Sequence, residues 1–140
     1  MAPDPPQRGV KAATYQLLLS TAMALIKQGG HIPSVADIAL RAQVSRATAY
    51  RYFPSRGALI GAVMESSLGP VRSLSGDSLS GRERVQQLFQ RTFPRFKEFE
   101  PQMRAAAQLA LEQWALARAG LLDEEPYRRG YRIAILEHAL

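Results

Sequence analysis

Apolar residues recur at helical spacing along nearly the whole chain, and no stretch alternates apolar and polar residues between hairpin turns. A first helix is expected over residues 10–28, and Gly29 and Gly30 end it. One face of that helix carries Leu18, Ala22, Leu25 and Ile26. The pattern therefore predicts an all-α protein.

Two serines mark the starts of two short helices. Ser34 precedes the second helix, with Asp37 three residues later in the position of a capping box. Residues 42–44 then form a tight turn, and Ser45 caps a third helix that ends at Phe53, because Pro54 cannot extend it comfortably. The sequence thus predicts two short helices joined by a tight turn.

Later helices follow from further caps and breaks. Ser55 opens a fourth helix, which Gly69 and Pro70 stop. Residues 71–81 are rich in Ser and Gly and indicate a linker or loose loop. A capping box of Ser80 and Glu83 then opens a fifth helix.

Three prolines shape the rest of the chain. Pro94 predicts a kink in the fifth helix, whereas Pro101 and Pro126 suit the first turns of a sixth helix over residues 102–118 and of a seventh. The seventh helix keeps its apolar spacing up to the last residue of the chain, through Tyr131, Ile135, Leu136 and Ala139. We therefore expect that a longer protein was truncated at its C-terminus.

Composition excludes several classes of protein. The chain has no cysteine, which excludes structural disulfides, Cys-ligated zinc and thiol nucleophiles. It has no run of 18 apolar residues, and its N-terminus lacks the apolar core of a signal peptide. We expect a soluble cytoplasmic protein without a membrane segment, in which residues 1–9 form a disordered leader.

The positive charge is concentrated in the first half. Residues 1–64 carry seven basic and two acidic side chains, a net charge of +5, whereas the remaining residues carry eleven basic and ten acidic ones. The total of +6 favours a polyanionic partner, although basicity alone is weak evidence for nucleic-acid binding.

The two short helices have the form of a helix-turn-helix, whose second helix can enter the major groove of DNA. At 100° per residue, Ala49 and Phe53 of the third helix fall together and would face the protein interior. The opposite side would carry Ala47, Thr48, Arg51 and Tyr52.

The outward side chains suit a duplex. Arg46 and Arg51 can donate hydrogen bonds to guanine edges or phosphates, and Ala47 and the Thr48 methyl group can approach a thymine methyl group. Tyr50 and Tyr52 can donate hydrogen bonds to phosphates.

The neighbouring positions add to this chemistry. The helix starts at Ser34 and Ser55 present free N–H groups to the DNA backbone, and Arg56 adds a cation just after the third helix. Residues 43–64 contain no acidic side chain that would repel DNA.

Other functions remain open on these residues alone. The helices could form a packing unit or a protein-binding domain whose exposed face happens to be basic. An enzyme is disfavoured, because His31 and His138 lie far apart and no catalytic, Walker or dinucleotide motif is present. The acidic pairs Glu124-Glu125 and Glu98-x-Glu100 are typical of solvated helix ends. No metal or other cofactor is expected.

Residues 34–63 resemble the N-terminal domain of the tetracycline-repressor (TetR) family. The matching pieces are DIA at 37–39, VSRAT at 44–48, YRYF at 50–53 and PSRGAL at 54–59, after an amphipathic helix of suitable length. With the preceding helix, the resemblance extends over about 60 residues in the right order, which makes the composite motif highly specific.

The resemblance implies an all-α fold with a helix-turn-helix domain at 10–54, a linking helix at 55–68 and the start of an effector-binding and dimerisation domain at 69–140. It implies a homodimer that binds a palindromic operator in double-stranded DNA, usually as a repressor that a small-molecule effector releases. The DNA-contacting positions would be Ser34, Val35, Ser45, Arg46, Ala47, Thr48, Tyr50, Arg51, Tyr52 and Arg56.

Two residues depart from the family pattern. Gln43 stands where the family often has Gly, in a turn expected to have positive φ. A residue other than Gly is expected either to cost about 1 kcal/mol there or to change the turn locally. Ala49 is smaller than the bulky apolar residue common at that position, so the third helix would sit closer to the core or pack less firmly.

The second half is expected to have an aromatic interior, which could be ordinary core or could line an effector pocket. The residues of this interior would be Phe89, Phe93, Phe96, Phe99, Met103, Trp114, Tyr127 and Tyr131. Phe96, Met103 and Trp114 are the candidates for the pocket, although aromatic residues at helical spacing are more often core.

Overall fold

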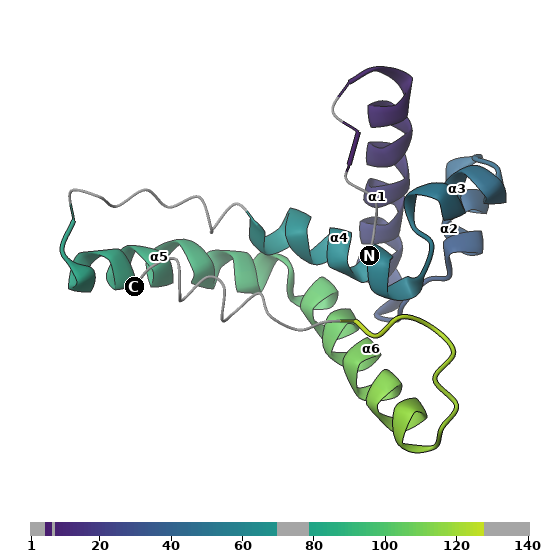
Figure 1. Ribbon diagram of the computed structural model, residues 1–140. Coiled ribbons are helices and arrows are strands. Elements are labelled where there is room, and N and C mark those ends of the chain that lie inside the picture. The colour runs from purple at the N-terminus through teal and green to yellow at the C-terminus, as the bar shows by residue number, and fades with distance from the viewer. Residues whose placement is uncertain (1–4, 7, 70–78, 128–140) are drawn as a thin grey trace.

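The computed structural model describes residues 5–6, 8–69 and 79–127, and all regular structure in this part of the chain is helical (Figure 1). The helices are α1 (Gly9–Gly29), α2 (Val35–Ala42), α3 (Arg46–Tyr52), α4 (Arg56–Leu68), α5 (Gly81–Glu98) and α6 (Glu100–Arg118). The all-α fold class and the order of the first six helices are confirmed.

Serine caps start the helices where the sequence places them. The hydroxyl oxygens of Ser34, Ser45 and Ser55 each accept a hydrogen bond from the backbone N–H three residues later, at 3.0–3.1 Å. Each cap satisfies an N–H group that the helix itself leaves unpaired, which stabilises a helix start by about 1 kcal/mol. Ser80 and Glu83 complete a reciprocal capping box at the start of α5.

The hydrophobic core forms around α1. Leu18, Ala22 and Ile26 are fully buried on one side of this helix. Helices α2, α4 and α6 all pack against α1. The core also contains Ile38 and Leu59, so the first four helices and α6 share one apolar interior.

Helix α1 is also, by length and composition alone, apolar enough to cross a membrane, alone among the described helices. However, its apolar stripe is covered by the neighbouring helices, and its outer face carries the exposed side chains of Lys11, Gln16 and Lys27. One side of α1 therefore belongs to the helical core, and its other side carries polar residues.

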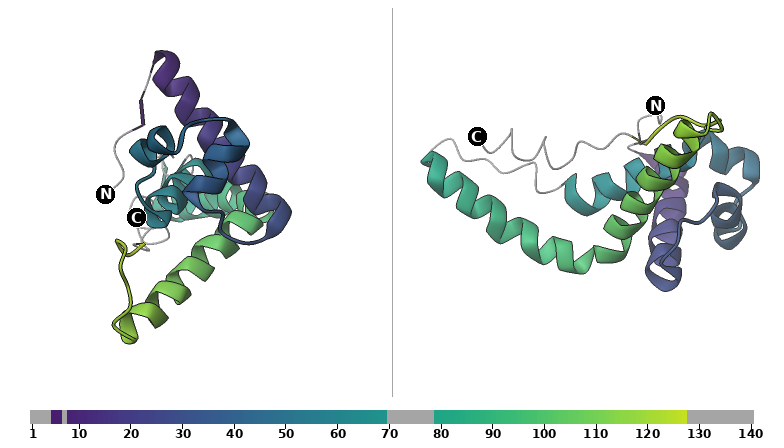
Figure 2. Two further views of the ribbon diagram at one scale, coloured as in Figure 1. Left: turned by 90° about the vertical axis from the view of Figure 1, so that its right-hand side faces the viewer. Right: turned by 90° about the horizontal axis from the view of Figure 1, so that it is seen from below.

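The arrangement in space leaves α3 at the edge of the molecule. Helices α2 and α3 lie together on one side of α1, and α4 runs from α3 beneath α1 towards α5 (Figures 1 and 2). Helix α6 crosses under α4, and the segment after α6 returns to the amino end of α4 (Figure 1). Parts of the chain far apart in sequence therefore meet just after α3.

The second half differs from the sequence predictions in two ways. Helix α5 continues through Pro94 to Glu98 and curves gently, where a kink was expected (Figure 2). The aromatic interior is only partly present: Phe89, Phe93 and Trp114 are 46%, 59% and 60% exposed, so the prediction is wrong for these three.

The physical reason lies in which faces of the two helices make contact. Helix α5 contributes the buried Leu88 and the partly buried Phe96 to the core, and α6 contributes Ala105, Ala106 and Leu109. Small alanines let α6 approach its neighbours closely, which leaves the large rings on the outside.

The end of the chain gives a partial outcome. Pro126 and Tyr127, where a seventh helix was expected to begin, are not helical. The rest of that expected helix lies outside the described residues, as do most of the leader at 1–9 and residues 71–78 of the expected linker.

Candidate nucleic-acid interface

Helix α3 is held by two inward residues, as its winding predicts. Ala49 is fully buried and Phe53, at the C-cap, is 1% exposed. The Phe53 ring lies 5.3 Å from the ring of Tyr15 on α1, centroid to centroid. Because Ala49 has only a methyl group, α3 can pack closely on its neighbours, and the larger Phe53 ring adds a second anchor at its end.

The opposite side of α3 is uncovered. The side chains of Arg46, Ala47, Tyr50 and Arg51 are all exposed, and Tyr50 is 45% accessible. No other described segment covers this side of the helix. A short amphipathic helix with two guanidinium groups and a phenol on its free side can enter a major groove, which is about 12 Å wide.

The amino end of α3 is ordered by its own hydroxyl groups. Ser45 accepts a hydrogen bond from the Thr48 backbone N–H at 3.1 Å and donates one to the Thr48 hydroxyl oxygen at 2.8 Å. The Thr48 side chain is half-buried. This pair fixes the Thr48 rotamer and leaves the backbone N–H groups of Arg46 and Ala47 at the open helix end.

Two of the expected contact residues have more limited access to a duplex. Val35 is 3% exposed because its side chain belongs to the core, so only its backbone can meet DNA. Tyr52 packs its ring edge-on against Tyr15, 6.1 Å between centroids, and is half-buried. Burial also raises the pKa of the Tyr15 phenol. The winding of α3 at 100° per residue missed the contact of Tyr52 with Tyr15, because it ignores the neighbouring helix.

The turn before α3 has the backbone that the family pattern requires. Gln43 is the C-cap of α2 with φ 56° and ψ 40°, and it is the one described residue other than glycine with positive φ. Its N–H donates to the Leu40 carbonyl oxygen at 3.2 Å, and the Val44 N–H donates to that of Ala39 at 2.9 Å. The turn therefore keeps its left-handed conformation without a glycine.

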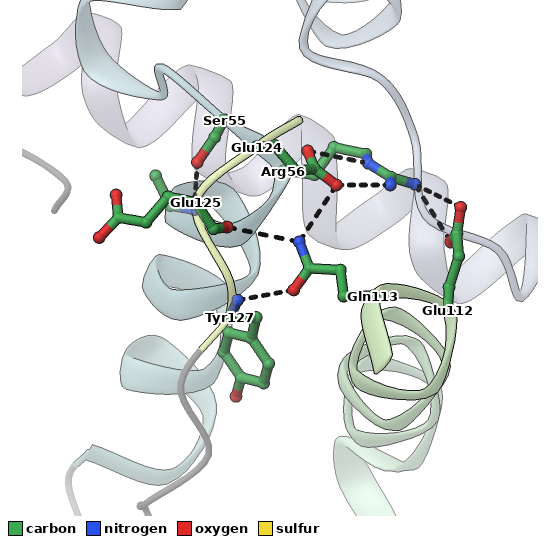
Figure 3. A network of polar contacts seen from close by, with 8 residues as sticks. Ser55, Arg56, Glu112, Gln113, Glu124, Glu125 and Tyr127 are labelled. Carbon is green, nitrogen blue, oxygen red and sulfur yellow. Dashed lines mark hydrogen bonds and ion pairs between the residues drawn. The ribbon is translucent and has the colours of Figure 1, made fainter. Parts of the chain in front are cut away.

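Arg56 has a different environment from the one expected. Its guanidinium donates to Glu124 at 2.6 Å and to Glu112 at 3.2 Å (Figure 3). The hydrogen bond with Arg56 holds the pKa of the Glu124 carboxyl below its usual range, and a hydrogen bond from Gln113 acts in the same direction. The hydrogen bond to Glu124 raises the pKa of Arg56 in turn, while burial partly opposes this.

The sequence could not reveal this cluster, because the two carboxylates lie 56 and 68 residues away from Arg56 along the chain. The absence of acidic residues between 43 and 64 is thus not an absence of acidic groups from the neighbourhood in space. As a site for phosphate, Arg56 is occupied in this structure by the chain's own carboxylates.

The three residues expected to line an effector pocket do not enclose one in the described part of the chain. Phe96 and Met103 pack against the core, whereas Trp114 is exposed and lies under the guanidinium of Arg118, 5.5 Å from the ring centroid. The hollow on α6 is shallow and is lined by other residues: Arg104, Ala107, Gln108, Leu111 and Glu112. Among the described residues, no three metal-ligating side chains come together.

Comparison with known proteins agrees with the geometry of α1 to α4. Residues 18–63 match the family model described as "Bacterial regulatory proteins, tetR family". Comparisons with curated proteins and with solved structures gave no match. The matched segment begins within α1, contains α2 and α3, and ends within α4. Residues 18–63 therefore correspond to the N-terminal domain of the tetR family of bacterial regulatory proteins, which supports a DNA-binding transcriptional regulator.

Proposed function

We propose that this regulator is a repressor that binds a palindromic operator as a homodimer, in the cytoplasm, and leaves it when a small-molecule effector binds. The observation that carries the DNA-binding part is the free side of α3, where Arg46, Ala47, Tyr50 and Arg51 are exposed while Ala49 anchors the helix. We propose no enzymatic activity and no cofactor.

The proposed contacts divide by chemistry. Arg46, Ala47, Thr48 and Arg51 would read base edges, because they lie at the free amino end and outer side of α3. Tyr50 and the half-buried Tyr52 would donate hydrogen bonds to phosphates. The capped helix starts at Ser34 and Ser45, with the backbone of Val35, would add N–H donors, and Arg56 would join once its carboxylates release it.

Dimerisation would supply the symmetry of the site. Two recognition helices about 34–36 Å apart can read two half-sites on one face of a duplex. We propose that residues 10–54 are the DNA-binding domain and that 69–140 are the start of a domain that pairs the subunits and binds the effector. Residues 55–68 would form the helix that links the two domains. Phe96, Met103 and Trp114 remain the proposed effector contacts, although the described residues form no enclosed cavity around them.

The experiment that tests the proposal is selection of bound sequences from random double-stranded DNA. We expect an enriched half-site of a few base pairs, repeated with inverted symmetry about one helical turn away. Enrichment of no sequence would contradict specific binding, and enrichment of single half-sites would contradict the dimer.

Arg51→Ala tests the face itself. It should weaken binding to the selected duplex by roughly 5- to 150-fold, which corresponds to about 1–3 kcal/mol for one base contact, while the helix content stays unchanged. Tyr52→Ala is less suitable, because it would also remove the ring contact with Tyr15. Arg91→Ala on the exposed side of α5 is the matched control, since it removes the same charge away from α3.

A further inference from the structure

The segment that follows α6 lies directly on the amino end of α4. A Cβ atom at Gly57 would stand 3.1 Å from the Glu125 carbonyl oxygen and 3.6 Å from the Tyr127 nitrogen. We call residues 121–127 the strap. It is an irregular segment without helix or strand, so its position depends on side-chain contacts.

Gln113 on α6 fastens the strap from below. Its amide oxygen accepts a hydrogen bond from the Tyr127 N–H at 2.6 Å, and its amide nitrogen donates to the Glu124 carboxylate at 3.1 Å and to the Glu125 carbonyl oxygen at 3.4 Å (Figure 3). Gln113 itself is 4% exposed. Both the oxygen and the nitrogen of this buried amide form hydrogen bonds with the strap, and these bonds hold the strap in a defined place.

The strap delivers negative charge to the first residue of α4. Glu124 lies 2.6 Å from one terminal nitrogen of Arg56, and Glu112 of α6 lies 3.2 Å from the other. Two carboxylates therefore share one guanidinium, and the cluster has a net negative charge. The Arg56 side chain is 29% exposed, so solvent and other anions can still reach it.

A DNA phosphate could bind the Arg56 guanidinium in the same way as the two carboxylates do. Phosphate and carboxylate oxygens both fit the planar fork of a guanidinium, and the amino end of a helix favours either anion. Phosphates flank a helix that sits in the major groove, and α4 starts only four residues after the end of α3. With the strap in place, the phosphate would instead meet two carboxylates.

We propose that the strap is an intramolecular competitor of DNA: Glu112 and Glu124 occupy Arg56, and DNA binds fully only when Arg56 exchanges these carboxylates for a phosphate. This inference rests on the proposed DNA-binding function. It makes operator affinity depend on the strap and on α6, and thus joins the second half of the chain to the DNA-binding domain through one side chain.

The test compares the double variant E112Q/E124Q with the unchanged chain in binding to a duplex of about 30 base pairs drawn from a random-sequence pool and, once it is known, to the selected site. Glutamine keeps the shape of glutamate and removes its charge. We expect about tenfold tighter binding, the gain that follows if Arg56 spends about nine-tenths of its time on the carboxylates.

Two control variants separate the strap contact from the general loss of negative charge. Asp123→Asn removes a charge from the strap next to Glu124, and Glu100→Gln removes one from the exposed pair with Arg104 on α6. Both should tighten binding far less than E112Q/E124Q. Equal gains from these controls and the double variant would overturn the proposal.

Two further variants address the mechanism. In the Arg56→Ala background, E112Q/E124Q should give no gain beyond that of the charge controls, because there is no guanidinium left to release. Gly57→Ala should tighten binding without changing any charge, since the added methyl group presses on the Glu125 carbonyl oxygen. A gain from E112Q/E124Q that persists in full without Arg56 would contradict the exchange.

The outcomes also separate this inference from the proposed function. If neither the unchanged chain nor E112Q/E124Q binds duplex DNA at low salt, the proposed function fails and the strap proposal with it. If the unchanged chain binds and the double variant only unfolds at a lower temperature without binding more tightly, the strap is a structural staple and this inference alone is overturned.

Discussion

The left-handed turn between α2 and α3 offers a quantitative test of the fold. Gln43 adopts φ 56° and ψ 40°, and its exposed side chain leaves the turn to be held by backbone hydrogen bonds. Gln43→Gly would keep every one of those bonds, since they use only main-chain atoms. The substitution therefore isolates the cost of placing an L-residue in this conformation.

Two opposing terms set its magnitude. An L-residue in the left-handed region costs about 1–2 kcal/mol, which Gly does not pay. In the opposite direction, Gly has more conformational entropy in the unfolded chain, so its ordering on folding costs about 0.5–1 kcal/mol more than that of other residues. The difference predicts that Gln43→Gly raises the free energy of unfolding by about 0.5–1 kcal/mol, or a midpoint temperature by about 2–5 °C.

The same chain contains the reciprocal site. Gly30 caps α1 with φ 66° and ψ 11°, and a Cβ atom there would meet no other atom within 4 Å. Gly30→Ala should therefore lower stability by about 0.5–1 kcal/mol through backbone strain alone. Gln43→Ala serves as the control, because alanine carries the same left-handed penalty as glutamine and should bring no gain.

Urea unfolding followed by circular dichroism measures all three variants, and an unchanged m-value would show that the same surface unfolds. A Gln43→Gly chain no more stable than the Gln43→Ala chain would refute the reasoning. It would mean that the turn relaxes out of the left-handed region, or that the Gln43 side chain makes a compensating interaction.

Three further predictions concern α3 and the start of α4. Phe53→Ala removes a ring that is 1% exposed and should lower the free energy of unfolding in urea by about 3–5 kcal/mol. Phe53→Leu should lower it clearly less, and a loss under about 1 kcal/mol for Phe53→Ala would mean that the ring is not an anchor. Ser45→Ala should cost about 1 kcal/mol and weaken DNA binding, because the N-cap of α3 and its bond to Thr48 are lost; unchanged stability would show that this cap adds nothing. The pKa of Glu124 is lowered in the folded chain, so its pairing with Arg56 stabilises the fold above the ordinary carboxyl range and is lost as pH falls through the lowered pKa. The stability gap between the unchanged chain and Glu124→Gln should therefore shrink from pH 7 towards pH 3, and a gap independent of pH would contradict it.

The sequence alone determined the first six helices and which side of α3 faces outward. Ser34, Ser45, Ser55 and Ser80 fix helix starts because a serine hydroxyl satisfies an N–H group only three residues away. The winding of α3 placed Ala49 inside and Arg51 outside because helical geometry is local. These are short-range interactions, so a pattern of neighbouring residues suffices to predict them.

Other features depended on how distant segments pack. Trp114 and Phe93 looked like interior residues because their spacing is helical, but spacing reveals that a face is apolar and not whether another helix covers it. Tyr52 fell on the outer side of the winding and is half-buried only because Tyr15 of α1 reaches it. The partial burial of Tyr52 is due to Tyr15, which lies far away in the sequence. The exposure of Phe93 and Trp114 reflects the lack of a covering helix among the described residues.

The environment of Arg56 shows the difference most clearly. In the sequence, Arg56 is a cation in a stretch, residues 43–64, that contains no acidic residue. Its charge and its position just after α3 can be predicted from the sequence alone. In the structure Glu112 and Glu124 reach it from the second half, because Gln113 holds the strap on α4. Residue type and local geometry are encoded residue by residue, whereas the field at a charged group is a sum over everything nearby in space, which only the tertiary structure defines.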